Sequence, residues 1–243
     1  MKKRLDQFLV ENGHFESRTR SQAAIMAGQI LVNEQKIDKA GTLVDIDSKI
    51  RILGEKLKYV SRGGLKLEKA LEEFNVDPSG MVCLDIGAST GGFTDCLLQR
   101  GAEKVYAVDV GYGQLDLKIR NNPKVVVIEK TNARYLRPED IPDKAALAVI
   151  DVSFISLAKI LPAVFDLLSE GGQVAALVKP QFEAGREQVG KGGIVRDENT
   201  RNEVLSKVIK EAESIGFNFV ASCDSPISGA DGNREFLIHL RKK

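Results

Sequence analysis

The stretch that decides the fold is Leu84-Asp85-Ile86-Gly87-Ala88-Ser89-Thr90-Gly91-Gly92-Phe93. An apolar segment ends there in an acidic residue, and a glycine-rich turn leads into a pattern typical of a helix. Glycines in such a turn let the backbone approach a ligand without a clash from a Cβ atom. The alternative is a tight turn that needs glycine only for its geometry. We favour the ligand interpretation because a strand precedes the turn and a helix follows it.

The spacing of these glycines narrows the kind of ligand. The pattern Gly87-x-x-x-Gly91-Gly92 differs from the GxGxxG of dinucleotide-binding folds, and it lacks the GK[ST] of a phosphate-binding loop. A cofactor without phosphates therefore fits the turn better. A sulfonium cofactor is such a ligand, and the carboxylate of Asp85 suits its positively charged amino-acid moiety.

Around this turn, apolar strands alternate with amphipathic helices. We expect strands at 81–86, 104–109, 124–129, 146–151, 172–178, 217–223 and 235–241, and helices at 65–74, 92–100, 112–120, 156–169 and 198–215. This alternation predicts an α/β fold with a doubly wound, mostly parallel seven-stranded sheet. The last two strands are joined without a helix, so they should form an antiparallel terminal hairpin. By analogy, this is the Rossmann-like architecture of class I methyltransferases.

The first 57 residues have a different pattern. Helices are expected at 3–12 and 19–27, followed by short strands at 30–33, 36–37, 43–44 and 49–53. The sequence thus predicts a small α+β domain at 1–57, a linker at 58–64 that ends in Gly63-Gly64, and a larger domain at 65–243.

Charge is divided unevenly along the 243 residues. Residues 1–66 carry 13 Lys and Arg against 8 Asp and Glu, whereas the rest carry 22 against 26, and the net charge is only +1. No apolar stretch approaches the roughly 20 residues of a membrane-spanning helix, so we expect a cytoplasmic protein that does not engage a membrane. Two isolated histidines and three dispersed cysteines argue against a metal site, a disulfide framework and a Ser–His–Asp hydrolase.

Two further polar residues at strand ends are candidates for holding the cofactor. Asp109 ends the second strand, where an acid accepts hydrogen bonds from ribose hydroxyls in nucleotide-binding folds. The alternative for Asp109 is a turn or helix-capping aspartate. Asn132 follows the third strand, where an adenine amino group can be read, although asparagine is common in any loop.

Candidate catalytic residues lie at the ends of other strands. Asp151 and Lys179 end the fourth and fifth strands and should face the ligand, because ligands sit beyond the carboxyl ends of strands in open α/β sheets. The alternative is a structural ion pair. Glu235 opens the last strand and Lys66 lies on the helix after Gly63-Gly64. Taken singly, each of these two residues would be an ordinary surface charge.

Four segments together resemble one family. They are 61–67 (SRGGLKL), 84–95 (LDIGASTGGFTD), 151–156 (DVSFIS) and 178–182 (VKPQF), and they are similar to the TlyA family of ribosomal RNA 2′-O-methyltransferases. The resemblance covers essentially the whole chain. It implies an S4-like RNA-binding domain ahead of an FtsJ-like (RrmJ-like) catalytic domain, with S-adenosylmethionine as cofactor and no metal.

The same resemblance implies roles for individual residues. The Lys–Asp–Lys–Glu tetrad of FtsJ-like enzymes corresponds by motif context to Lys66, Asp151, Lys179 and Glu235, with no departure at these positions. We expect Lys179, held by Asp151 and Glu235, to accept or steer the proton of the ribose hydroxyl, and Lys66 to orient that hydroxyl. The expected cofactor-binding residues are Asp85, Gly87, Ala88, Ser89, Gly91, Gly92, Phe93, Asp109, Asn132 and Asp151.

Basic residues of the first domain are candidates for binding RNA. Arg18 and Arg20 stand at the expected start of its second helix, where helix N–H groups add affinity for phosphate. The remaining candidates are Lys2, Lys3, Arg4, Lys36 and, in the linker, Arg62. The alternative is a solvated charged face. The glycine-rich loop 181–196 is expected to be either a mobile RNA-gripping lid or a plain flexible connection.

The resemblance implies ribosomal RNA or a ribosomal subunit as partner. Its target would be cytidine in 23S and, for some members, 16S ribosomal RNA. Two alternatives stay open at this point. One is a non-catalytic RNA-binding or assembly factor with a methyltransferase fold. The other is a haemolysin, a label that this family often carries, although lysis requires a membrane-inserting segment that the sequence lacks.

Overall fold

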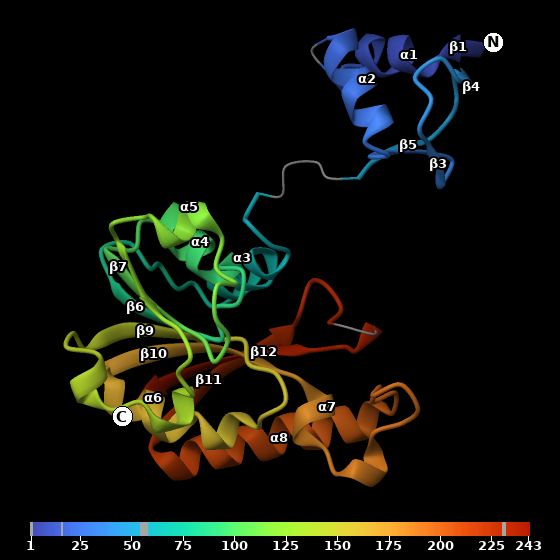
Figure 1. The fold of residues 1–243 in the computed structure, drawn as a ribbon. Helices are drawn as coiled ribbons and strands as arrows, with labels where there is room; N and C mark the ends of the chain where they lie inside the picture. Colours follow the sequence, from blue (N-terminus) through green and yellow to red (C-terminus); the bar gives the residue numbers. More distant parts are fainter. Residues whose placement is uncertain (1, 16, 54–57, 230–231) are drawn as a thin grey trace. The chain divides into compact units, whose positions relative to one another are not determined.

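The computed structural model describes residues 2–15, 17–53, 58–229 and 232–243 (Figure 1). The chain divides into two compact units, residues 1–57 and residues 58–243. Each unit has its own apolar core.

The first unit is a small α+β structure. Its elements are β1 (Lys2–Arg4), α1 (Leu5–Glu11), α2 (Arg18–Met26), β2 (Ile30–Val32), β3 (Gln35–Ile37), β4 (Leu43–Asp45) and β5 (Ile50–Ile52). The strands form a three-stranded sheet of order β3-β2-β5 and a separate β1-β4 pair. The sequence predicts a helix from residue 3, but residues 2–4 instead pair with β4 as a strand. Helical periodicity therefore begins only at Leu5, whose side chain is fully buried.

The second unit is a three-layer α/β structure. Its larger elements are α3 (Gly63–Glu73), β6 (Val82–Ile86), α4 (Gly92–Gln99), β7 (Lys104–Val108), α5 (Leu117–Arg120), β8 (Val125–Ile128), β9 (Ala145–Ile150), α6 (Leu161–Leu167), β10 (Leu168–Val178), α7 (Pro180–Glu183), α8 (Glu198–Ile215), β11 (Phe217–Asp224) and β12 (Phe236–Lys242). Short 3-10 helices also occur in it, among them η1 (Ala133–Tyr135), η2 (Pro138–Asp140), η3 (Leu157–Lys159) and η4 (Arg186–Gln188).

The seven strands have the order β11-β12-β10-β9-β6-β7-β8. Strands β6 to β10 pair in parallel, whereas β12 is antiparallel to both β10 and β11. The predicted fold class, a mostly parallel sheet with a terminal antiparallel hairpin, is therefore confirmed. Because β6 to β10 run the same way, the residues that follow them gather at one edge of the sheet.

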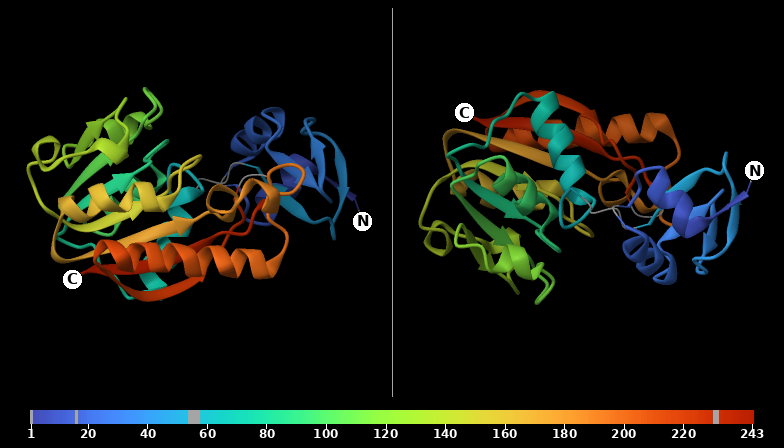
Figure 2. Two further views of the ribbon diagram at one scale, coloured as in Figure 1. Left: turned by 90° about the horizontal axis from the view of Figure 1, so that it is seen from below. Right: turned by 90° about the horizontal axis from the view of Figure 1, so that it is seen from above.

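Helices cover both faces of this sheet. Figures 1 and 2 show α3, α4 and α5 on one face and α6 and α8 on the other. Side chains alternate along the strands, so that in β6 Leu84 and Ile86 belong to the core under α6 and α8, whereas Cys83 belongs to the core under α3 and α4. Burial on both faces explains why these strands read as continuous apolar runs.

Two predicted helices are shorter than expected. The pattern at 112–120 yields only α5, which begins after the capping carboxylate of Asp116, because Gly113 before it has φ +70°. The pattern at 156–169 divides into η3 and α6, and β10 already begins at Leu168. Leu168 continues the apolar pattern of the helix, but it pairs with Ala145 of β9 instead, and the Ser169 hydroxyl donates to Ala145 O at 3.2 Å.

Residues 58–64, predicted as a linker, lie within the second unit. Tyr59 is 2% exposed, and its hydroxyl donates to Glu68 Oε1 on α3 at 2.9 Å. An added Cβ at Gly64 would lie 2.3 Å from the Tyr59 ring, so glycine at this position permits close packing. The glycine pair that resembles a flexible joint in the sequence is in fact the first turn of α3.

Candidate active site

The turn between β6 and α4 forms the centre of the candidate site. Gly87 has φ +85°, and a Cβ there would lie 2.4 Å from the backbone oxygen of Asp151. Gly91, which caps α4, has φ +94°. Both conformations favour glycine. The turn therefore packs closely against the end of β9. This packing brings the predicted cofactor-binding residues of the turn next to Asp151, a predicted catalytic residue.

Asp85 lies behind this turn, fully buried. One carboxylate oxygen, Oδ2, accepts a hydrogen bond from the Thr94 hydroxyl at 2.6 Å, and Oδ1 has no hydrogen-bond partner among the described residues. Burial, together with the nearby carboxylates of Asp151 and Asp109, raises the pKa of Asp85 to about 7. Three acids thus converge on the turn, and their combined charge favours a cationic ligand.

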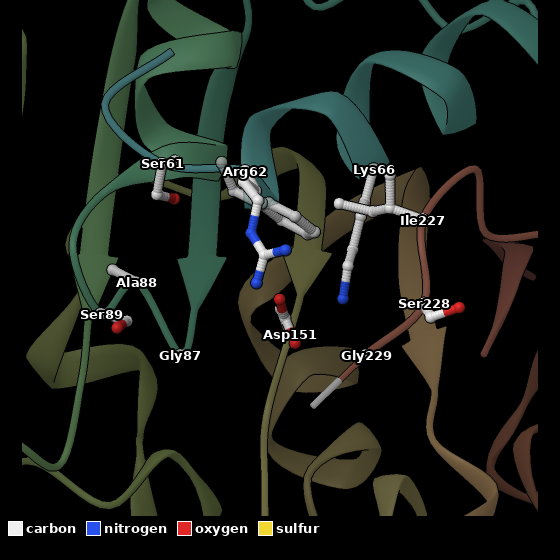
Figure 3. A pocket seen from close by; sticks show the side chains of 13 residues that line it. Ser61, Arg62, Lys66, Gly87, Ala88, Ser89, Asp151, Ile227, Ser228 and Gly229 are labelled. Carbon is white, nitrogen blue, oxygen red and sulfur yellow. The ribbon is translucent and has the colours of Figure 1, made fainter. Parts of the chain in front are cut away.

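A cavity of about 250 Å³ opens on one side of the turn. Figure 3 shows the side chains of Arg62, Lys66 and Asp151 pointing into this cavity. Arg62 directly precedes α3, Lys66 lies on α3, and Asp151 directly follows β9. Its other lining residues are Ser61, Gly63, Gly87, Ala88, Ser89, Gly92, Phe93, Ile227, Ser228 and Gly229. Of the predicted cofactor residues in this turn, Asp85 and Gly91 do not belong to the lining.

A second cavity of about 560 Å³ adjoins the first and shares Gly87, Ser89 and Asp151 with it. Asp109 and Asn132 both line this second cavity, as predicted from their strand-end positions. Its walls also include the apolar side chains of Val108, Val110, Val152, Phe154, Ile155 and Ile160. A flat, apolar group with a few polar edges fits such a space.

The two predicted cofactor contacts in this cavity also organise local backbone. Asp109 Oδ2 accepts from Ser89 N and Oδ1 from Gly111 N, both at 2.7 Å. Asn132 Oδ1 accepts from Arg134 N at 3.1 Å and caps η1. Both side chains thus make the local hydrogen bonds of a turn or a cap, which hold each in a fixed orientation at the cavity wall, and their contact with a cofactor stays a prediction.

The four catalytic candidates form two ion pairs. Lys179 Nζ lies 2.6 Å from Asp151 Oδ1 and donates to Ser153 Oγ at 2.9 Å. Lys66 Nζ lies 2.5 Å from Glu235 Oε2, and both side chains are buried. The sequence predicts that Glu235 holds Lys179, whereas in the structure Glu235 pairs with Lys66. Each lysine thus has its own carboxylate, which keeps the ammonium groups in place at the edge of the sheet.

Phe154 is a site residue that the sequence names only as part of a motif. It lines the larger cavity, its side chain is 90% exposed, and its backbone has φ +64°. Its ring lies 4.9 Å from that of Phe182. An exposed aromatic ring beside a cavity can stack on a nucleic-acid base. Sequence alone gives no sign of this exposure, because phenylalanine in an apolar run predicts burial.

In the first unit, the buried carboxylate of Asp6 organises two of the RNA-binding candidates. Arg4 Nε lies 3.1 Å and Arg18 Nη2 lies 2.9 Å from its oxygens, and Arg4 holds the pKa of Asp6 well below its usual range. Lys3 pairs with Glu11 at 2.5 Å. Arg18 begins α2, where the Ser17 hydroxyl accepts from Arg20 N as a helix cap. Sequence reasoning missed Asp6 because a lone acid gives no signal of burial.

The positions of four other RNA-binding candidates are as follows. Arg20 is exposed in the first turn of α2, Lys36 is exposed on β3 with its side chain over Gly28, and Lys2 is exposed on β1. Arg62 lies in the second unit and lines the smaller cavity. Whether these residues contact RNA stays a prediction.

The glycine-rich segment 181–196 contains local structure. It includes the end of α7, the short helix η4 and a bridge between Gly190 and Ile194. The buried side chain of Asn233 accepts from Val195 N at 3.1 Å and donates to Gly193 O at 2.9 Å. The far end of the segment is therefore tied to the β11–β12 connection.

Within the described ranges, no cluster of three or more metal-binding side chains occurs. In the same residues, no helix is long and apolar enough to cross a membrane.

Comparison with known proteins identifies the family. An FtsJ-like methyltransferase model matches residues 59–242, and an S4 domain model matches residues 3–50. The 16S/23S rRNA (cytidine-2′-O)-methyltransferase TlyA of Mycobacterium tuberculosis is 44% identical over 239 residues, which are 98% of this chain and 89% of that protein. The chain belongs to the TlyA family of FtsJ-like methyltransferases.

Other members of the TlyA family carry a hemolysin name. Hemolysin A of Brachyspira hyodysenteriae is 47% identical over 98% of this chain and 99% of that protein. A solved structure from Streptococcus thermophilus, provisionally named a hemolysin, is 50% identical and has a TM-score of 0.78 over 100% of this chain and 89% of that chain. The hemolysin-named and methyltransferase-named relatives are thus one family.

Proposed function

We propose that this chain transfers a methyl group from S-adenosylmethionine to the 2′-hydroxyl of a cytidine in ribosomal RNA. The observation that carries the proposal is the meeting of the Lys66–Glu235 and Lys179–Asp151 pairs beside two adjoining cavities, with Asp151 lining both. Cytidine is supported by the names of two relatives, the Mycobacterium tuberculosis protein and the 23S rRNA (cytidine-2′-O)-methyltransferase of Campylobacter jejuni, which is 35% identical. Such a substrate places the reaction in the cytoplasm.

The residues present fit the proposed cofactor. Asp85 has a buried carboxylate oxygen that finds no hydrogen-bond partner in the part of the chain that the structure describes. It lies behind a turn that carries little side-chain bulk, as an amino-acid ammonium and a sulfonium would require. The larger cavity offers the Asp109 carboxylate to ribose hydroxyls, and Asn132 and apolar walls to a purine. When bound, S-adenosylmethionine supplies an electrophilic methyl group on its sulfonium sulfur.

The lysines act on the hydroxyl that receives this methyl group. A ribose hydroxyl is a weak nucleophile and must lose its proton as it attacks. The Lys179–Asp151 pair takes up that proton in this proposal: as Lys179 accepts it from the hydroxyl, one of the ammonium protons of Lys179 passes to the Asp151 carboxylate. Lys66, fixed by Glu235, orients the hydroxyl and stabilises its developing negative charge. Holding both reactants in position supplies much of the remaining acceleration.

The proposed RNA contacts are of two kinds: contacts with phosphates, which position the RNA, and a contact with the target base at the cavity. The exposed Arg20 and Lys36 of the S4 unit are suited to phosphates, which give affinity without sequence information. Phe154 offers its exposed ring at the cavity for a base turned out of its helix. The proposed substrate is therefore a structured RNA with an accessible cytidine.

The test is methylation of purified ribosomal subunits with labelled S-adenosylmethionine, followed by mapping of 2′-O-methylated nucleotides by their resistance to alkaline cleavage. Lys179→Ala and Asp151→Ala should each lose at least about 100-fold in kcat, as removal of a positioned proton-transfer group does. Lys210→Ala, at an exposed site on α8, is the matched control and should retain full activity.

Two results would contradict the proposal. Near-normal methylation by a folded Lys179→Ala or Asp151→Ala variant would remove that residue from the mechanism. Tight cofactor binding by the wild-type chain with no methylation of either subunit would favour the non-catalytic assembly factor instead.

A further inference from the structure

The loops that follow β9 and β10 carry Asp151 and Lys179, and three contacts beyond that ion pair join them. Lys179 Nζ donates to Ser153 Oγ at 2.9 Å, and the rings of Phe154 and Phe182 lie 4.9 Å apart. The third contact is a hydrogen bond of 2.8 Å from Leu157 N to the carboxylate of Glu183. All three therefore cross between the same two loops, within a few residues of the reacting groups.

The loop after β9 needs such support because its backbone is strained. Phe154 has φ +64°, a left-handed conformation that bulky side chains rarely adopt. Burial of its own ring cannot hold it there, since 90% of the side chain is exposed. Strained residues persist where the surrounding structure over-determines them, and here the surrounding structure is the loop after β10.

Glu183 is the buried anchor of this arrangement. It lies at the end of α7 with 6% of its surface exposed, so the position is one that an apolar side chain would fill at lower cost. Oε1 accepts from Leu157 N, whereas Oε2 is buried without a hydrogen-bond partner among the described residues. Burial, and secondarily the carboxylate of Glu211 on α8, raises the pKa of Glu183 above its ordinary value.

The other charged and polar groups facing Glu183 come from α8 and from the start of η3. Lys207 Nζ donates to the backbone oxygen of Glu183 at 3.4 Å and lies 4.0 Å from Glu211. Ser156, the cap of η3, contributes a hydroxyl that favours the ionised carboxylate. The Glu183 side chain therefore binds the loop after β9, whereas Lys207 binds the Glu183 backbone.

We propose that Glu183 is a positioning residue for methyl transfer, acting by holding the loop after β9 so that Ser153 and Asp151 fix the ammonium group of Lys179. The inference rests on the proposed function of Lys179. What the position requires is an acceptor oxygen for Leu157 N of the right reach, rather than a charge.

Three variants test this role in the full-length protein on its ribosomal subunit. Glu183→Ala removes the acceptor and should lower kcat roughly 10- to 100-fold, the scale expected when a reacting group is misplaced by about an ångström. The dissociation constant for S-adenosylmethionine should change less than kcat, because Glu183 itself lines neither cavity and the turn after β6 is left intact. Glu183→Gln retains an acceptor oxygen and should restore kcat to within about threefold of wild type.

A double-mutant cycle with Ser153→Ala shows whether Glu183 acts through the loop. If it does, the Glu183→Ala, Ser153→Ala double variant should be little slower than the slower single variant, because both changes free the same ammonium group. Multiplication of the two single effects would overturn the proposal.

Val208→Ala on α8, fully buried in the same core, controls for a general loss of stability. It should lower the melting temperature and leave kcat unchanged below the transition. Equal kcat losses in Val208→Ala and Glu183→Ala at matched stability would overturn the proposal, as would wild-type kcat in Glu183→Ala. Inactive wild-type protein would instead contradict the proposed function, so the two failures are distinguishable.

Discussion

Replacing Asp85 by asparagine should stabilise the protein while removing its cofactor site. The carboxyl group of Asp85 is fully buried, and its pKa in the folded chain is about 7. In the unfolded chain an aspartate titrates near 3.9. Between these two values the folded state binds more protons, so its stability falls as pH rises from about 4 to about 7 and is level above. The full cost of ionisation is about 4 kcal/mol, from three pKa units of about 1.4 kcal/mol each.

Asparagine avoids this cost because it keeps an oxygen for the Thr94 hydroxyl and cannot ionise. Urea denaturation of both proteins across a pH series measures the effect. The free energy of unfolding of Asp85→Asn relative to wild type should increase by about 2.5 kcal/mol between pH 5 and pH 8. Other titrating groups cancel in this difference. A difference that does not change with pH would refute the assignment of a buried, raised carboxyl pKa to Asp85.

Three other outcomes follow from the same structure. Affinity for S-adenosylmethionine should rise by up to about tenfold per pH unit as the pH increases towards 7 and should level off above, because the ionised form of Asp85 binds the cation. Calorimetry in buffers of different ionisation enthalpy should show that binding releases a proton. An affinity that does not change with pH would contradict this prediction. Gly64→Ala, whose Cβ would overlap the Tyr59 ring, should lower stability by about 1–3 kcal/mol, whereas Gly63→Ala, with its nearest neighbour at 3.4 Å, should not; equal melting temperatures would contradict it. Arg20→Ala with Lys36→Ala should weaken RNA binding and flatten the dependence of log K on log salt by about 1–2 units, and an unchanged slope would exclude both residues from phosphate contact.

The architecture could be predicted because local patterns of apolar and polar residues indicate its strands and helices. Apolar strands alternating with helices indicate a parallel sheet, and the absence of a helix between the last two strands indicates their antiparallel pairing, which the structure has. The positions of Asp109 and Asp151 at the cavity wall were also predictable, since the end of a strand fixes where a side chain emerges. Element boundaries were less predictable where pairing overrides propensity, as at residues 2–4.

Which charged side chains pair with each other was harder to predict from the sequence. From the sequence, Glu235 is expected to pair with Lys179, but it binds Lys66, which lies 169 residues away along the chain. A motif names which charged residues belong to a site without stating their distances. The glycine pair at 63–64 was misread for a related reason, since the aromatic ring that requires Gly64 has no periodic relation to it.

The amino-acid sequence alone was enough to determine the succession of strands, the presence of an S4-like and an FtsJ-like part, and the identity of the four charged candidates. Periodicity and motifs carry this information because they are properties of neighbouring residues. Folding in three dimensions set which lysine each carboxylate holds, the raised pKa of Asp85, the outward turn of Phe154 and the anchoring of its loop by Glu183. Each of these depends on burial and on distances between segments that are far apart in the chain. Such quantities exist only once the sheet has assembled and water has been excluded from its edge.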